Sequence, residues 1–161
     1  MELSTFTGCS IVNLDPTKSD ENFDLDENND MLIFGRDCYM IKNADVVIVH
    51  LTDDISVGGS QEMLIAKYYK KPLIGIAPKG GKFNKAIKVI QGKEYKNWIH
   101  PFVSVPCDGV VEDVKSAGKF IKHHFINKDS KVVPDITLIE DSVAYYMKHF
   151  HKYDKFLHDK N

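Results

Sequence analysis

The strongest constraint on the fold is a short, almost uninterrupted run of β-branched residues at 46–51, Val-Val-Ile-Val-His-Leu. A strand with one face in water alternates apolar and polar residues, whereas this run is apolar at nearly every position. Such a run is typical of a strand buried on both faces of a parallel sheet. Three further apolar runs bounded by turn residues predict strands at 10–14, 73–77 and 102–105.

Apolar residues at helical spacing occupy the intervals between these strands. They predict helices at 32–44, 60–71, around 83–90 and at 111–125. Strands that alternate with helices in this rhythm indicate an α/β fold with right-handed crossovers. The 161 residues correspond to a single domain.

The C-terminal part, residues 127–161, is expected to form a helical extension of that domain. Residues 137–140, Thr-Leu-Ile-Glu, match a capping box and predict a helix start. An apolar stripe at helical spacing follows, which we interpret as core or as a subunit interface. Its members are Ile139, Val143, Tyr146, Met147, Phe150 and Tyr153.

The charge balance limits the partners that we expect. The chain carries 21 basic and 23 acidic residues, for a net charge of -2, and Arg36 is its single arginine. A chain so close to neutral has no broad attraction for nucleic acid or anionic lipid. We therefore expect neither a polymeric nucleic acid nor a membrane as a partner.

The three cysteines are an odd number without CxxC spacing. A disulfide framework and a cysteine-based zinc site are both disfavoured, and free thiols suit the reducing cytoplasm. The histidines of the C-terminal half lack carboxylates at a ligand spacing, so we expect no metal. The N-terminus has no secretory signal, and no apolar run approaches the ~20 residues that span a bilayer. These features predict a cytoplasmic protein.

The segment that leaves the strand at 46–51 is the candidate site, because ligands of open parallel sheets bind beyond the carboxyl ends of the strands. Gly58 and Gly59 would let the backbone approach a substrate, and Ser60 is placed to cap the next helix. Glu62 would then lie in the first helical turn, ionised and able to act as a nucleophile. Glutamate in a first turn and a Gly-Gly loop are both common for structural reasons alone. Neither GxGxxG nor a phosphate-binding loop is present.

Several segments in order resemble the nucleoside 2-deoxyribosyltransferase superfamily, which includes 2'-deoxynucleoside 5'-monophosphate N-glycosidases. The resemblance extends from about residue 10 to residue 102. It implies a small flavodoxin-like domain, with a parallel sheet of about four to five strands, helices on both faces, and assembly into a homodimer or larger oligomer. The matching residues are Ala-Asp-Val-Val-Ile-Val at 44–49, Ser56, Gly58, Gly59, Glu62, Ala66 and Lys-Pro-Leu-Ile at 71–74.

The resemblance also implies roles for individual residues. Glu62 would attack the anomeric carbon and form a glycosyl-enzyme, while Asp37 would contact the base and protonate it as it leaves. Ser56 corresponds to the residue that binds the 5' end of the substrate, a position that is serine in the monophosphate N-glycosidases. A neighbouring subunit would close the site and bring the loop 80–84, with Asn84, to the substrate.

The expected activity is cleavage or transfer at the N-glycosidic bond of a (deoxy)nucleoside or its 5'-monophosphate, with no metal or organic cofactor. Whether water or a second base takes the sugar stays open, as do the base and the 2' position. The chain lacks the family's opening strand of the Ile-Tyr-Leu-Ala-Gly-Pro type, so we expect an open sheet edge. The alternative is a non-catalytic nucleotide-binding protein or an oligomeric interaction module.

Overall fold

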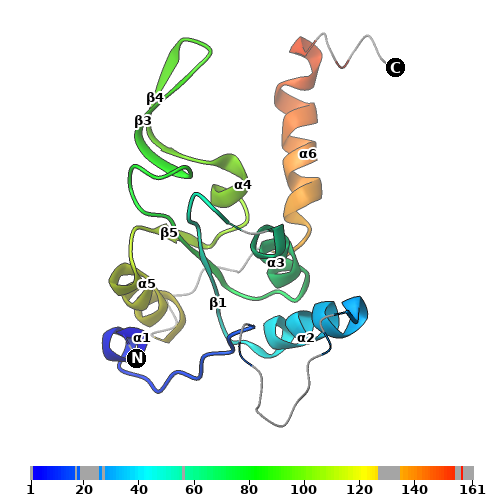
Figure 1. The fold of residues 1–161 in the computed structure, drawn as a ribbon. Coiled ribbons are helices and arrows are strands. Elements are labelled where there is room, and N and C mark those ends of the chain that lie inside the picture. Colours follow the sequence, from blue (N-terminus) through cyan, green and yellow to red (C-terminus); the bar gives the residue numbers. More distant parts are fainter. Residues whose placement is uncertain are drawn as a thin grey trace.

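The protein is a mixed α/β structure with two separate sheets, seen in the computed structural model of Figure 1. The model describes residues 2–16, 18, 26, 28–55, 57–126, 135–154 and 157. A parallel sheet has the strand order β1-β2-β5, and a two-stranded antiparallel sheet pairs β3 with β4. The strands are β1 (Val47–His50), β2 (Leu73–Ile76), β3 (Asn84–Ile90), β4 (Lys93–Ile99) and β5 (Gly109–Val111).

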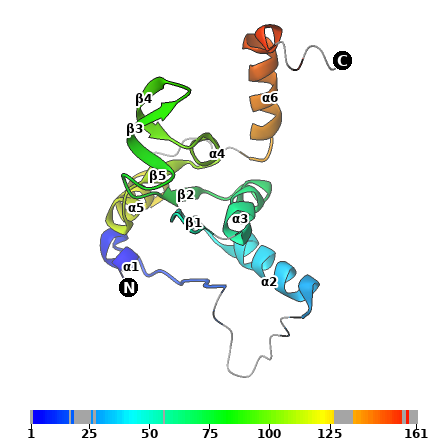
Figure 2. The same cartoon turned by 45° about the horizontal axis from the view of Figure 1, so that its top comes forward.

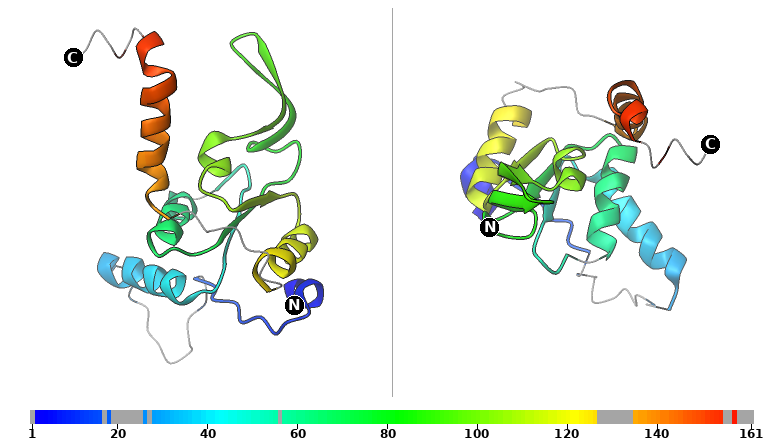
Figure 3. Two further views of the ribbon diagram at one scale, coloured as in Figure 1. Left: turned by 180° about the vertical axis from the view of Figure 1, so that it is seen from behind. Right: turned by 90° about the horizontal axis from the view of Figure 1, so that it is seen from above.

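Helices cover both faces of the parallel sheet. Helices α2 and α3 lie on one face, and α1 and α5 lie on the other (Figure 3). The helices are α1 (Glu2–Thr7), α2 (Asp30–Asn43), α3 (Val57–Tyr68), α4 (Pro101–Ser104), α5 (Val114–Ile121) and α6 (Leu138–His149). A π-helical turn (Lys122–Ile126) continues α5, and a 3-10 turn (His151–Tyr153) follows α6.

Strand β1 divides its side chains between two cores, as its unbroken apolar run predicts. Val49 and, just beyond the strand, Leu51 join a core with Met63 of α3. Ile48 points the other way and packs against a core that contains Ile74 of β2 and Ala117 of α5. The predicted strand is confirmed and has a core on each face, although Val49 is its one buried residue and His50 at its end is exposed.

The central strand of the parallel sheet is β2, in which every residue is buried. It pairs with β1 from Val47↔Leu73 onward and with β5 from Ile74↔Gly109 onward. Within the described residues this sheet has three strands, fewer than the four to five expected. Strand β1 therefore has no strand on its other side there and forms an edge of the sheet.

Two predicted strands are wrong. Residues 10–14 are extended but unpaired, and Val12 is 83% exposed. Residues 102–105 belong mostly to the short helix α4, which starts at Pro101 after an N-cap at His100. Proline suits the first helical position because its fixed φ is helical and its missing N–H needs no partner there. Only Val103 of this helix is buried, so the apolar run is not buried on two sides as a strand of a parallel sheet would be.

The helix predicted around 83–90 is also wrong, because β3 and β4 form a β-hairpin there. Gln91 and Gly92 connect the strands, with φ of 50° and 77°. Positive φ at both central residues is the requirement of a two-residue type I′ turn, whose twist matches that of paired strands. Ile87, Val89 and Ile90 favour a strand because β-branched side chains fit the pleated surface.

The helix predicted at 111–125 is confirmed in its central part and begins later than expected. Gly109–Val111 is the edge strand β5, and α5 starts only after Asp113. The Asp113 carboxylate accepts a hydrogen bond from the Ser116 N–H at 2.6 Å and caps the helix. This N-cap fixes where the strand gives way to the helix.

Helix α6 stands away from the parallel sheet, with its first turn near α3 (Figures 1 and 2). The predicted capping box does not form, because Thr137 has helical backbone angles and its side chain makes no capping bond. Asp135 instead accepts a hydrogen bond from the Thr137 N–H at 2.9 Å. The apolar stripe is not core in this chain, since its residues from Ile139 to Phe150 are mostly half or more exposed. No helix in the described ranges is long and apolar enough to cross a membrane.

Candidate functional site

Two carboxylates that the sequence singled out, Asp37 and Glu62, lie close together where α2 packs against α3. Asp37 is on α2 and Glu62 is on α3, and these two helices pack against each other. Glu62 is half-buried, and this burial raises the pKa of its carboxyl group above the ordinary 4.5. The negative charge of Asp37 raises the pKa of Glu62 further. The two residues that the resemblance assigns to catalysis thus lie on packed helices and influence each other electrostatically.

Arg36 provides a positive charge beside this pair. Its guanidinium lies 4.0 Å from an Asp37 carboxylate oxygen. The same guanidinium donates hydrogen bonds to the backbone carbonyls of Pro16, at 2.9 Å, and Lys18. The single arginine of the chain therefore fastens the segment before α2 onto this helix, next to Asp37.

The position of Glu62 along its helix differs from the sequence expectation. Helix α3 begins at Val57, so Gly58, Gly59 and Ser60 lie inside its first turn rather than in a loop before it. Ser60 is therefore not the N-cap, and Glu62 lies in the second turn. The dipole of a helix acts mainly on its first turn, so burial and Asp37 dominate the electrostatics of Glu62 instead.

The remaining predicted site residues lie apart from the two carboxylates or cannot be placed. Ser56 is outside the described residues. Asn84 begins β3, and its amide donates a hydrogen bond to the Ala77 carbonyl at 3.0 Å. Across the described chain, no hydrogen bond joins Asn84 to Glu62 or Asp37.

The loops after β1 and β2 meet at the carboxyl edge of the parallel sheet. The Asp53 carboxylate accepts a hydrogen bond from the Lys82 N–H at 2.7 Å. Together with the bond from Asn84 to Ala77, this contact fixes the base of the β3–β4 hairpin against the loop that leads to α3. The backbone at Lys82 thus borders the edge of the sheet at which we expected a ligand to bind.

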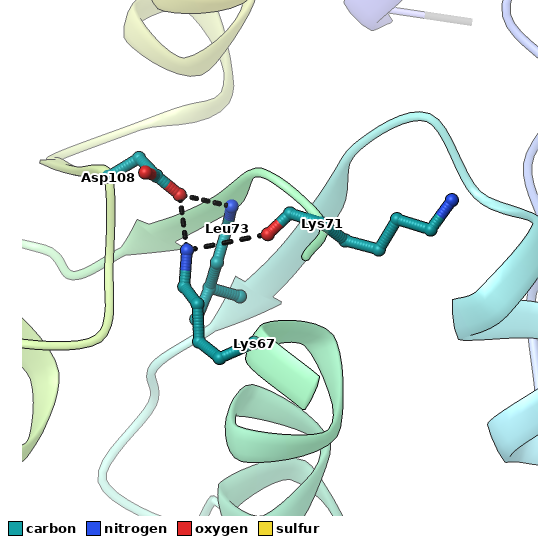
Figure 4. Close-up of polar contacts among 4 residues, drawn as sticks. All are labelled: Lys67, Lys71, Leu73 and Asp108. Carbon is teal, nitrogen blue, oxygen red and sulfur yellow. Dashed lines mark hydrogen bonds and ion pairs between the residues drawn. The ribbon is translucent and has the colours of Figure 1, made fainter. Parts of the chain in front are cut away.

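A buried ion pair anchors the other end of α3, and the sequence analysis missed it. Lys67 is fully buried, and its Nζ lies 2.6 Å from an Asp108 oxygen. The same oxygen accepts the Leu73 N–H at 2.7 Å, and the ammonium also donates to the Lys71 carbonyl at 3.4 Å (Figure 4). The sequence signal was a lysine four residues after the buried Met63, on the apolar face of the helix.

Cys107 is buried beside this ion pair, and burial raises the pKa of its thiol to about 12. A thiol that holds its proton so tightly is a poor nucleophile. In the parts of the chain that are described, no three histidine, cysteine, aspartate or glutamate side chains gather as metal ligands would.

An open depression between α1 and the start of α5, lined by Phe6 and Val114 among others, is separate from the carboxylate pair.

A pair of carboxylates can perform glycosyl chemistry by taking two different roles. The ionised group can attack or stabilise a cationic sugar, and the second group can deliver a proton to a leaving group. Comparison with known proteins finds no matching family model, no similar curated protein and no similar solved structure.

Proposed function

We propose that this protein cleaves or transfers the N-glycosidic bond of a (deoxy)nucleoside or its 5'-monophosphate, with Glu62 as nucleophile. The observation that supports the proposal is that α2, with Asp37, packs on α3, with Glu62, and that burial and the charge of Asp37 both raise the pKa of Glu62. Breaking this bond places positive charge on the sugar, which an anion beneath the ring stabilises. In this proposal Asp37 handles the departing base.

The resemblance in sequence supports the same pair of residues from an independent direction. The family pattern selects Glu62 and Asp37 by their spacing from the strand at 46–51, and they lie on packed helices. A flavodoxin-like origin also agrees with a parallel sheet covered on both faces. In this view the substrates are free cytoplasmic nucleosides or nucleotides.

The test is release of free base from deoxynucleosides and their 5'-monophosphates, followed by chromatography. We expect Glu62→Gln to abolish release, because an amide cannot form the glycosyl ester. Glu94→Gln is the matched control, since Glu94 is an exposed glutamate on the β-hairpin. Full activity of Glu62→Gln would refute the assignment of the nucleophile.

A second variant separates the two carboxylates. We expect Asp37→Asn to slow turnover by ~10²–10⁴-fold, the usual contribution of general acid–base catalysis. Substrates with good leaving groups should lose less, because their bases need less protonation. An equal loss for good and poor leaving groups would assign Asp37 to positioning instead.

The exposed stripe of α6 favours a second candidate function, that of an oligomeric interaction module. Val143 and Met147 are each about half exposed within a single chain. An apolar surface left in water costs ~25 cal/mol per Å², and a twofold contact between copies would bury the stripe twice. We expect light scattering to show a homodimer or larger species and Val143→Asp to disrupt it. A monomer at micromolar concentration would contradict this candidate.

A further inference from the structure

A concentration of basic charge lies outside the candidate site, on residues 79–99, which we call the basic hairpin. This segment comprises the loop after β2 and the strands β3 and β4. It contains six of the chain's lysines, a single acidic residue, Glu94, and no arginine. The near neutrality of the whole chain hides this asymmetry. The lysines are Lys79, Lys82, Lys85, Lys88, Lys93 and Lys96.

Within the described residues, Lys79 is the one lysine of the basic hairpin that pairs with a carboxylate. Lys79, at its base, lies 3.9 Å from Glu112. Among the described residues, the other five lysines form no ion pair with a carboxylate. The hairpin also projects away from the parallel sheet, as Figures 1 and 2 and the left view of Figure 3 show. Unpaired charge on a projecting arm is free to meet a partner.

Four of the six residue pairs of the hairpin contain a lysine opposite an apolar or aromatic residue, and the pair Val89↔Glu94 contains the acidic one. Lysines at four levels therefore follow one another over ~17 Å of ribbon, at the usual rise of a strand. Because each lysine faces an uncharged residue, the arm avoids like charges directly opposite one another. The pairs are Lys85↔Trp98, Ile87↔Lys96, Lys88↔Tyr95 and Ile90↔Lys93.

Aromatic rings accompany these lysines along the returning strand. The Lys93 ammonium lies 5.5 Å from the ring centre of Tyr95, and that of Lys88 lies 5.3 Å from the ring centre of Trp98. Beyond them, the ring of His100 approaches both Trp98 and the exposed Phe102. Rings interleaved with basic residues are the surface on which unpaired bases stack while their phosphates meet the positive charges.

We propose that the basic hairpin binds single-stranded nucleic acid, through its lysines to phosphates and through its aromatic rings to bases. Lysine is a compact charge without the fork that reads base edges, so the binding is independent of sequence. The exposed ring of Tyr95 favours a single strand over a duplex, whose bases are already stacked. The proposal does not depend on the glycosidic activity.

The test is fluorescence anisotropy of a labelled oligothymidine against the full chain at several salt concentrations. We expect Lys88→Gln/Lys96→Gln to weaken binding at least tenfold and to reduce the salt slope by ~1.4, since each phosphate contact on a single strand contributes ~0.7. The control Lys115→Gln/Lys119→Gln removes the same charge from α5 and should leave the affinity within about twofold. Tyr95→Ala should weaken binding about tenfold, and Tyr95→Phe should retain it.

Three results would overturn the proposal. They are no binding at low salt, equal effects of the hairpin and control variants, and hairpin-dependent binding that is tighter for phosphatidylserine vesicles or duplex DNA than for the single strand. Thermal unfolding of each variant checks that the fold is intact. Glu62→Gln should still bind the oligonucleotide, so the failure of either proposal leaves the other testable.

Discussion

Helix α3 carries two ionisable side chains little more than one turn apart, and their surroundings are opposite in kind. Lys67 is fully buried against an opposite charge, with a 2.6 Å contact to Asp108. Glu62 is half-buried beside a like charge, that of Asp37, and its pKa is raised. At Lys67 the opposite charge of Asp108 compensates the buried charge, whereas at Glu62 burial and the like charge of Asp37 both disfavour the ionised form. This difference indicates that the charge of Lys67 contributes to the stability of the fold, whereas that of Glu62 opposes it.

The largest effect should come from breaking the compensated pair. Lys67→Met leaves Asp108 partly buried without its cation, although the Leu73 N–H still donates to it. Removing one partner of a buried ion pair costs ~3–5 kcal/mol of the free energy of unfolding. Chemical denaturation measures the loss. Lys115→Met on the exposed side of α5 is the control, and an equal loss there would contradict a special role for Lys67.

A double-mutant cycle sharpens the same point. Asp108→Asn keeps an acceptor for the Leu73 N–H but removes the negative charge next to Lys67. In the double variant with Lys67→Met, the two losses should overlap by ~0.5–3 kcal/mol, as for residues in direct contact. Strictly additive losses would mean that the two charges do not act on each other.

Substitution of Glu62, unlike that of Lys67, should stabilise the protein. Because the folded-state pKa of Glu62 is raised, the folded protein binds this proton more tightly than the unfolded chain does. Ionisation of Glu62 therefore costs stability at pH 7, and Glu62→Gln should raise Tm there. The gain should shrink as the pH falls toward and below 4.5, where both states hold the proton. A lower Tm for Glu62→Gln at pH 7 would contradict the unfavourable placement.

The smallest effect concerns the carboxylate neighbour alone. Asp37→Asn removes the weaker of the two causes that raise the pKa of Glu62, while burial remains. The titration of Glu62, followed by NMR of its side-chain carboxyl carbon, should move to lower pH without reaching the ordinary value. Asp30→Asn, at the first residue of α2, should leave the titration in place. A shift to higher pH in Asp37→Asn would contradict the effect of the Asp37 charge on Glu62.

The two sites of α3 were not equally predictable from the sequence. Glu62 and Asp37 were selected by a family pattern, and their packed helices were predicted from apolar spacing. The ion pair was missed because it depends on Asp108, which only the three-dimensional fold brings next to Lys67. A single lysine on an apolar helix face is a weak signal until its partner is known.

The fold shows the same division. The β1 and β2 strands were predictable because burial on both faces leaves no room for polar residues. The hairpin was missed because Ile87, Val89 and Ile90 suit either periodicity and Gln-Gly is a less familiar turn pair than Asn-Gly. The strand predicted at 102–105 ignored the helix-starting position of Pro101. Net charge, finally, is an average that cannot report the local concentration of lysines in residues 79–99.

The hairpin also has a consequence for the order in which the chain folds. Strands β2 and β5 pair although the whole hairpin lies between them in the sequence. A hairpin with a tight turn closes in ~1–10 μs, whereas parallel pairing must first close a long loop. Once β3 and β4 have paired, the two ends of the segment between β2 and β5 are already near each other. Closing this segment then costs less conformational entropy. Early formation of the β3–β4 hairpin would thus help to bring Asp108 within reach of Lys67.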